Sequence, residues 1–309
     1  MTPFFAPISV YSLLFQPSFD TGTYSPSGSA WRGAFGHALR QMVCVTKQRE
    51  CTGCSVLRSC LYTYIFESTP PEETEKMRRY RSVPHPYALS LPDSAPSPFV
   101  LNLTLFGHSN EFLPHVLHAF SRAGVGGVGS RQTVYTLLRV LQKSSLEQDE
   151  WVPIMEGNAP PRPLPPKNGM IPPCYDRVVV RLLSPLRLMV DSHLVSPRTF
   201  SFASFFMPLL RRLSMLAYFH GGQELSADFA GLAAQARKVA ITRSAIEWEE
   251  GVRYSSRQKT PMNMGGIMGE FELSGVDLLP FWPFLWNGQW TQNGKLTTMG
   301  LGCYRIGKE

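Results

Sequence analysis

The chain has 309 residues, of which 30 are lysine or arginine and 23 are acidic, so its formal net charge is +7. With 43% hydrophobic residues it reads as a globular protein of about two domains, which excludes an intrinsically disordered chain. The basic balance favours an anionic partner, most commonly nucleic acid.

No segment reads as membrane-spanning. The most apolar stretch, residues 202–219, is interrupted by Arg211 and Arg212, whose charges are costly at the centre of a bilayer. The first 15 residues lack the basic start and the small-residue cleavage site of a signal peptide. We therefore expect a cytoplasmic protein that does not contact a membrane.

The first half of the chain begins with a predicted strand over residues 4–15, followed by a turn cluster and an amphipathic helix over about residues 29–43. Ser29 is the predicted N-cap of this helix. His37 and Arg40 lie on its polar face, opposite an apolar face made of Trp31, Phe35, Leu39 and Met42.

Further elements follow in both halves. Seven prolines fall within residues 158–173, which is typical of a domain boundary. We expect the dense aromatic run at 281–286 to belong to the core. Before the prolines we predict strands at 87–91 and 99–106, a helix at 110–122, a glycine-rich loop at 124–129 and a strand at 133–141; after them, strands within 178–189, a helix at 202–219, a strand at 269–273, a helix at 278–286, a glycine-rich loop at 294–302 and a strand at 303–306.

Each half therefore reads as strand, helix, strands, helix, glycine-rich loop, strand, which is the order of a ferredoxin-like unit. The prediction is an α+β chain of two tandem ferredoxin-like (RRM-like) domains with glycine-rich loops. The first domain spans residues 1–157 and carries a cysteine-rich insertion at 44–60. Residues 158–173 form the linker, and the second domain spans 174–309 with its glycine-rich loop at 294–302.

The insertion contains four cysteines within 17 residues: Cys44, Cys51, Cys54 and Cys60. Four thiolates with a Cys-x-x-Cys core suit tetrahedral zinc, and such a metal would be structural because the cysteines fill all four positions. An iron–sulfur cluster and four reduced thiols are the alternatives, whereas a cytoplasmic location disfavours disulfides.

Three segments near the C-terminus form a recognisable set: RYSSRQK at 253–259, MGGIMGE at 264–270 and GKLTTMGLG at 294–302. Together with WRGAFGHALR at 31–40, they resemble the motifs of the CRISPR precursor-RNA processing endoribonucleases, the sixth numbered Cas family of the RAMP superfamily. The resemblance extends over nearly the whole chain because the motifs lie at both ends.

This resemblance implies two ferredoxin-like domains and a CRISPR repeat RNA as substrate, with the crRNA as product. It also implies cleavage without a catalytic metal, in which the 2′-hydroxyl attacks the adjacent phosphate. The products would carry a 5′-hydroxyl and a 2′,3′-cyclic phosphate.

Cleavage by a 2′-hydroxyl needs a general base and a general acid, and a histidine near neutral pH can be either. His37 is the preferred catalytic residue, since the family often has its catalytic histidine in this helix. Tyr24 before the helix and Lys47 after it are candidates to assist. A surface histidine without a role is the alternative.

The candidate RNA-binding residues are basic. Lys295 lies in the second glycine-rich loop, where glycines permit close approach to a phosphate; a tight turn is the alternative for that loop. The complete predicted set is Arg32, Arg40, Arg253, Arg257, Lys259 and Lys295.

Two other functions remain open. One is a non-catalytic RAMP subunit that binds guide RNA among other CRISPR effector subunits. It would share the glycine-rich loops and the basic residues, but it needs no titrating histidine or equivalent acid–base pair. A zinc-dependent interaction module without an RNA role is the third, and the net charge of +7 counts against it.

Overall fold

Helix α1 (Gly28–Val43) forms where the amphipathic pattern predicts it. In the computed structural model its N-cap is Ser27, whose hydroxyl accepts a hydrogen bond from the Ala30 N–H at 3.3 Å. The predicted N-cap, Ser29, is instead buried inside the first turn. The helix therefore starts one residue earlier than its apolar periodicity indicates.

The structure describes residues 5–19, 22, 24–71, 74–76, 82–92, 98–167, 169–255 and 260–308, with only the backbone at 252–255 and 260–261. Within these ranges, none of the helices combines the length and the hydropathy needed to cross a membrane.

The chain divides into two compact units. The N-terminal unit comprises residues 6–168 and 215–223, and the C-terminal unit comprises residues 1–5, 169–214 and 224–309. The main chains of Ile8 and Lys167 exchange two hydrogen bonds, at 3.0 and 3.1 Å, so the proline-rich stretch is tied at Lys167 to the first strand of the N-terminal unit. The extent of the predicted linker, residues 158–173, stays a prediction.

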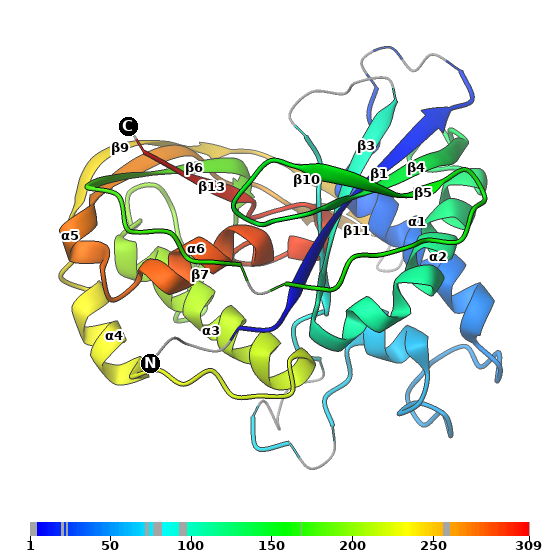
Figure 1. Cartoon of the computed structure of the whole chain (residues 1–309), viewed down its shortest axis with the longest axis horizontal. Helices are drawn as coiled ribbons and strands as arrows, with labels where there is room; N and C mark the ends of the chain where they lie inside the picture. Colours follow the sequence, from blue (N-terminus) through cyan, green and yellow to red (C-terminus); the bar gives the residue numbers. More distant parts are fainter. Residues whose placement is uncertain are drawn as a thin grey trace. The chain divides into compact units, whose positions relative to one another are not determined.

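One five-stranded antiparallel sheet forms the frame of the N-terminal unit, with strand order β2-β3-β1-β4-β5. Helices α1 and α2 lie together against it (Figure 1). In chain order the elements are β1 (Ile8–Pro17), α1, the π-helical turn η1 (Thr63–Glu67), β2 (Tyr87–Ser90), β3 (Phe99–Phe106), the 3-10 helix η2 (Gly107–Phe112), α2 (Leu113–Val125), β4 (Tyr135–Lys143) and β5 (Trp151–Glu156).

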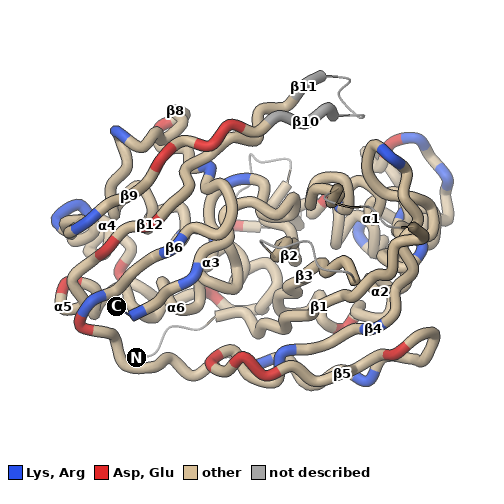
Figure 2. Tube along the Cα trace, turned by 90° about the horizontal axis from the view of Figure 1, so that it is seen from above, with Lys and Arg blue, Asp and Glu red and all other residues tan. Residues whose placement is uncertain are grey.

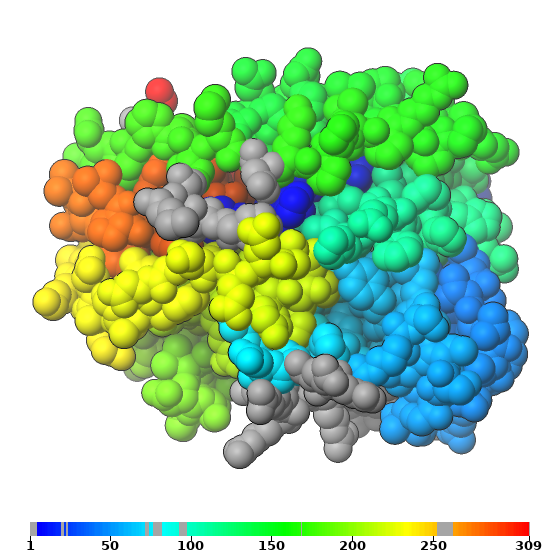
Figure 3. All heavy atoms as spheres, turned by 60° about the horizontal axis from the view of Figure 1, so that its bottom comes forward, coloured from blue at the N-terminus to red at the C-terminus, as the bar shows by residue number. Residues whose placement is uncertain are grey.

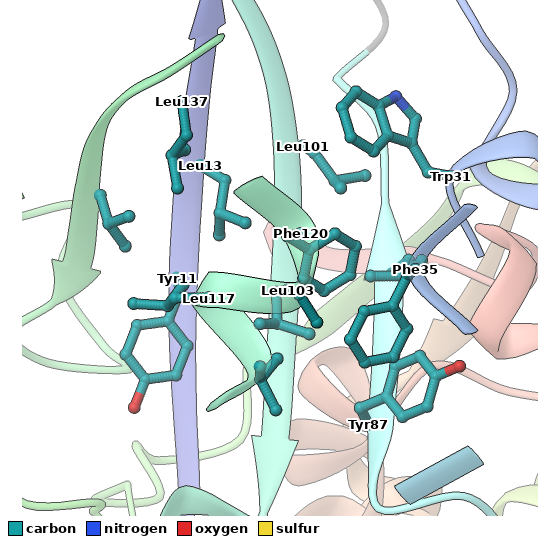
Figure 4. Close-up of a cluster of buried hydrophobic side chains, with 14 of the residues drawn as sticks. Tyr11, Leu13, Trp31, Phe35, Tyr87, Leu101, Leu103, Leu117, Phe120 and Leu137 are labelled. Atoms are coloured by element: carbon teal, nitrogen blue, oxygen red, sulfur yellow. The ribbon is translucent and has the colours of Figure 1, made fainter. Parts of the chain in front are cut away.

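The core of this unit lies between the helices and the sheet. Trp31 is fully buried, and its indole stacks on Phe99 of β3 at a centroid distance of 5.4 Å. Phe35, one turn later, stacks on Phe120 of α2 at 4.3 Å. Figure 4 shows the rings of Trp31, Phe35 and Phe120 beside leucine side chains of the sheet. Packing of this face against the sheet leaves the opposite face of α1 available to solvent.

Replacing Trp31 with alanine is expected to lower the free energy of unfolding by about 3–5 kcal/mol, because it leaves a cavity among surrounding aromatic rings. Urea unfolding followed by circular dichroism measures the change. Val45→Ala is the control, since that side chain is 76% exposed and its loss should matter by less than about 0.5 kcal/mol. Equal stability losses in the two variants would contradict the described core.

The C-terminal unit contains a four-stranded antiparallel sheet with strand order β13-β6-β12-β9 and two short hairpins. Phe205 packs against Phe271 and Tyr304 of this sheet at 5.3 and 5.2 Å between ring centroids. The elements are β6 (Arg177–Leu186), β7 (Met189–Val190), β8 (His193–Leu194), α3 (Phe202–His220), α4 (Phe229–Ala236), β9 (Ile241–Glu249), β10 (Val252–Ser255), β11 (Thr260–Asn263), β12 (Gly266–Ser274), α5 (Gly275–Leu278), α6 (Trp282–Thr291), the 3-10 turn η3 (Thr297–Met299) and β13 (Tyr304–Lys308).

The aromatic run at 281–286 lies mainly in α6, and its large side chains are buried, as the sequence predicts for a core segment: Phe281, Trp282, Phe284, Leu285 and Trp286. Each unit orders its principal elements as strand, helix, strand, strand, helix, strand. The α+β class is thus confirmed, with two antiparallel sheets that are each packed with helices.

The elements that the sequence does not predict include β5, α4, β9 and the β10–β11 hairpin. Strand β5 contains Pro153, which interrupts the usual strand pattern but is tolerated because β5 lies at the edge of its sheet. Strand β9 is also an edge strand, and most of its side chains are exposed, so it lacks the apolar signal that marks a buried strand.

Candidate functional site

Helix α1 presents His37 to solvent, on the face opposite Phe35. The His37 Nε2 lies 2.9 Å from the side-chain nitrogen of Gln41, one turn further along the helix. The amide nitrogen is a hydrogen-bond donor, so this contact suits the neutral tautomer of His37 that carries its proton on Nδ1. In that tautomer, Nε2 is the atom that would take a proton from a substrate hydroxyl.

Tyr24 lies in the segment before α1 and contacts the first glycine-rich loop. Its hydroxyl accepts a hydrogen bond from the Ser130 N–H at 3.0 Å, and the Arg131 guanidinium lies 4.4 Å from the centre of its ring. A Cβ at Gly129 would fall 2.2 Å from the Tyr24 hydroxyl oxygen, so this loop needs glycine at that point. Tyr24 therefore closes the loop that precedes β4.

Lys47 lies beyond the other end of α1, with an exposed side chain and a positive φ of 54°. His37 is nine residues from the start of α1, a rise of about 14 Å along the helix axis. Tyr24 precedes the helix and His37 lies well along it, so the two side chains have different neighbours. Lys47 follows the helix and has different neighbours again. The catalytic roles of all three stay predictions.

The two arginines predicted on α1 both make contacts within the protein. The Arg32 guanidinium lies 4.3 Å above the ring of Phe66 and 3.5 Å from the His85 Nε2. Arg40 donates hydrogen bonds to the backbone carbonyls of Gln48 and Arg49, the latter at 2.7 Å. Both arginines hold the segment after α1 against the helix, which is a structural task that the charge pattern does not predict.

In the C-terminal unit, the two glycine motifs meet at the end of strand β6. The Gly302 N–H donates to the Pro185 carbonyl at 3.1 Å, and the Lys295 N–H donates to the Arg187 carbonyl at 2.9 Å. A Cβ on Gly266 would lie 2.9 Å from the Leu186 carbonyl oxygen. Segments 264–270 and 294–302 therefore both contact residues 185–187, a proximity that the sequence spacing does not reveal.

The loop at 294–302 is a closed turn. Gly302 has a φ of +76°, and a Cβ there would fall 1.8 Å from the Asn293 carbonyl oxygen. The Gly294 N–H bonds the Asn293 side chain at 2.7 Å. These glycine N–H groups are thus directed at the protein, which favours the tight-turn interpretation for this backbone. The side chain of Lys295 is exposed.

Arg187 is the cationic residue that the sequence analysis misses. Its guanidinium donates to the Gly265 carbonyl at 2.8 Å and approaches the Asn263 side-chain oxygen at 3.5 Å. It thereby links the base of the β10–β11 hairpin to the turn that carries Lys295. The only sequence signal for it is a charged residue between two buried leucines, Leu186 and Leu188.

The remaining predicted RNA contacts belong to that hairpin. Arg253 is on β10, where its backbone pairs with Met262 of β11. Arg257 and Lys259 lie outside the described residues. Figure 2 shows lysine and arginine positions along both units, so the net charge of +7 does not by itself select one surface.

The cysteine segment lies between α1 and η1, at the surface of the molecule (light blue in Figure 3). Its four predicted ligands line one pocket: Cys44, Cys51, Cys54 and Cys60. All four are free thiols. Among the described residues, no three histidine, cysteine, aspartate or glutamate side chains are arranged to hold a metal ion.

Comparison with known proteins gives two family matches. Residues 7–167 match the model AF_1859_N, described as an N-terminal domain, and residues 180–304 match the CRISPR-associated endoribonuclease Cas6. The curated proteins contain no match to this chain.

Solved structures match over almost the whole length. The product complex of Thermus thermophilus Cas6 (TTHB231) is 14% identical with a TM-score of 0.56, and the alignment covers 97% of this chain and 99% of that one. The product complex of Cas6 (TTHA0078) is 13% identical with a TM-score of 0.54 and the same coverage. A Cas6-related protein from Pyrococcus furiosus is 10% identical with a TM-score of 0.50, covering 98% of this chain and 99% of that one.

The class of protein is thus a two-domain α+β protein with a Cas6-like fold. The fold similarity covers nearly the full length of the solved structures, and residues 180–304 also match a family model. Residues 180–304 belong to the CRISPR-associated endoribonuclease Cas6 family by their match to its model, and the whole chain has the fold of the solved Cas6 structures.

Proposed function

We propose that this protein binds CRISPR repeat RNA and cuts precursor crRNA without a catalytic metal. The 2′-oxygen attacks the adjacent phosphorus, the bond from phosphorus to the 5′-oxygen breaks, and the products carry a 2′,3′-cyclic phosphate and a 5′-hydroxyl. One group takes the proton of the 2′-hydroxyl and another gives a proton to the departing 5′-oxygen. The match of residues 180–304 to the Cas6 family carries the proposal.

His37 is the residue we assign to proton transfer. Its exposure lets an RNA strand reach the ring, and an imidazole can act as a general base near neutral pH. Gln41 orients the imidazole from one turn away. Tyr24 and Lys47 remain candidates for the second proton-transfer group. That role requires one of them to reach the same scissile phosphate as His37, because the 2′-oxygen and the departing 5′-oxygen flank a single phosphorus.

We also propose that both units are ferredoxin-like, with the glycine-rich loops and the cysteine-rich insertion as additions. The strand orders β2-β3-β1-β4 and β13-β6-β12-β9 support this, since each has its first and third strands at the centre of the sheet.

The second candidate function is a non-catalytic RNA-binding subunit of a CRISPR complex. The observation in its favour is that the side chain touching His37, Gln41, is an amide that does not titrate. The solved relatives include a Cas6-RT-Cas1–Cas2 complex, so a protein with this fold occurs in a larger assembly. Other CRISPR subunits are therefore proposed partners.

One assay separates these functions. Purified protein is incubated with the candidate repeat RNA in EDTA, and cleavage and binding are measured on the same samples. The processing enzyme cuts the RNA, the non-catalytic subunit binds it without cutting, and an interaction module without an RNA role does neither.

Arg187→Ala is expected to weaken binding of repeat RNA several-fold and to lower the free energy of unfolding by about 1.5–3 kcal/mol, because the charged hydrogen bond to the Gly265 carbonyl is lost. Filter binding and urea unfolding measure the two effects. Arg198→Ala is the control, since it removes an equal charge from an exposed position. Equal RNA affinities in these two variants would contradict an RNA-binding role for the Arg187 side of this unit.

A further inference from the structure

The segment between α1 and η1 brings its four thiols to one pocket. Its Cys-x-x-Cys core forms a tight turn, in which the Cys54 N–H donates to the Cys51 carbonyl at 3.1 Å. The Thr46 hydroxyl lies 3.9 Å from the Cys44 sulfur and 3.5 Å from the Cys54 sulfur, so it bridges the two. The segment therefore folds back on itself, so that Cys54 lies near Cys44, ten residues earlier.

We propose that Cys44, Cys51, Cys54 and Cys60 bind one zinc ion as thiolates. Four soft sulfur ligands within one short segment suit a closed tetrahedral site, which leaves no open position for chemistry. The thiols line a common pocket without forming a ligand shell. Closure of the segment around the metal therefore accompanies binding, as is usual where metal binding and folding are coupled.

The cysteine segment contacts the C-terminal end of α1, so a metal bound there would stabilise that end of the helix. Arg40 donates to the carbonyls of Gln48 and Arg49 inside the cysteine segment and also lies 5.7 Å from the centre of the Tyr62 ring. The metal thus stabilises the segment that holds the end of α1, one turn beyond His37. This zinc site is independent of the proposed RNA cleavage, because it supplies structure and not a reacting group.

The test uses the full-length chain, expressed in zinc-supplemented medium and purified without chelators. Elemental analysis should find about one zinc per chain. Cobalt added to the demetallated protein should give the intense visible absorption of a tetrahedral thiolate site. Removal of the metal should lower the thermal midpoint by about 5 °C or more.

The paired variant Cys51→Ser, Cys54→Ser should lose both the zinc and the cobalt absorption. Cys174→Ser, in the C-terminal unit and outside this pocket, should retain both. Wild-type protein with less than about one zinc in ten chains and no cobalt absorption would overturn the proposal, even if the paired variant does not fold. Stoichiometric iron with acid-labile sulfide would also overturn it, in favour of an iron–sulfur cluster.

Discussion

Exchanging Arg257 and Lys295 for glutamate is expected to weaken binding of CRISPR repeat RNA roughly tenfold at physiological salt and to flatten its salt dependence. Each lost phosphate contact removes about 0.7 from the slope of log affinity against log salt on a single strand, so two contacts remove about 1.4. Lys295 is exposed beside the Arg187 carbonyl, whereas Arg257 belongs to the segment between β10 and β11, outside the described residues.

The measurement is a salt series of binding isotherms for wild type and variant. Lys238→Glu combined with Arg198→Glu is the matched control, since it changes the net charge by the same amount at exposed positions in the same unit. If only the net positive charge of the protein mattered, the test variant and the control variant would lose the same RNA affinity. If the control loses as much affinity as the test variant, the two predicted contacts are not the RNA-binding site. Four basic residues close together in the sequence of the N-terminal half, Lys76, Arg78, Arg79 and Arg81, would then be tested next.

Local elements of this fold follow from the sequence where one face is apolar. The spacing of Trp31, Phe35 and Leu39 predicts α1 because these side chains meet a sheet in the folded chain, and all three are fully buried. The edge strands β5 and β9 are not predicted because their contacts are largely backbone hydrogen bonds. Such bonds do not require a particular pattern of apolar and polar side chains.

The candidate site follows from the sequence only in part. His37 is predicted at the surface and lies there, since its position follows from the helix period alone. The joining of segments 264–270 and 294–302 at Pro185–Arg187 depends on tertiary contacts, so the spacing along the chain carries no signal for it. The contacts of Arg32 and Arg40 within the protein cannot be predicted for the same reason. The sequence pattern of an arginine on the polar face of a helix is the same whether its side chain contacts solvent or a neighbouring loop.

Replacing His37 with alanine is expected to slow single-turnover cleavage of repeat RNA by about 10²–10⁴-fold, which is the usual contribution of one general acid or base. RNA affinity should stay close to that of the wild type, because phosphate contacts dominate affinity and a neutral imidazole adds little to them. Gln41→Ala should have a smaller effect on the rate, since it removes the orienting hydrogen bond and leaves the ring. The measurement is the cleavage rate with enzyme in excess over labelled RNA.

A 2′-deoxy substitution at the scissile nucleotide distinguishes the mechanism from the residue assignment. It removes the attacking oxygen, so cleavage should stop for wild type while binding remains. EDTA should leave the rate unchanged, and the zinc content is measured on the same sample because loss of a structural metal could slow cleavage through misfolding. If His37→Ala cuts at the wild-type rate while the 2′-deoxy RNA stays intact, the mechanism holds and the base is another group, with Tyr24 and Lys47 tested next. Cleavage of the 2′-deoxy RNA, or inhibition by EDTA with zinc retained, would refute attack by the 2′-hydroxyl without a catalytic metal.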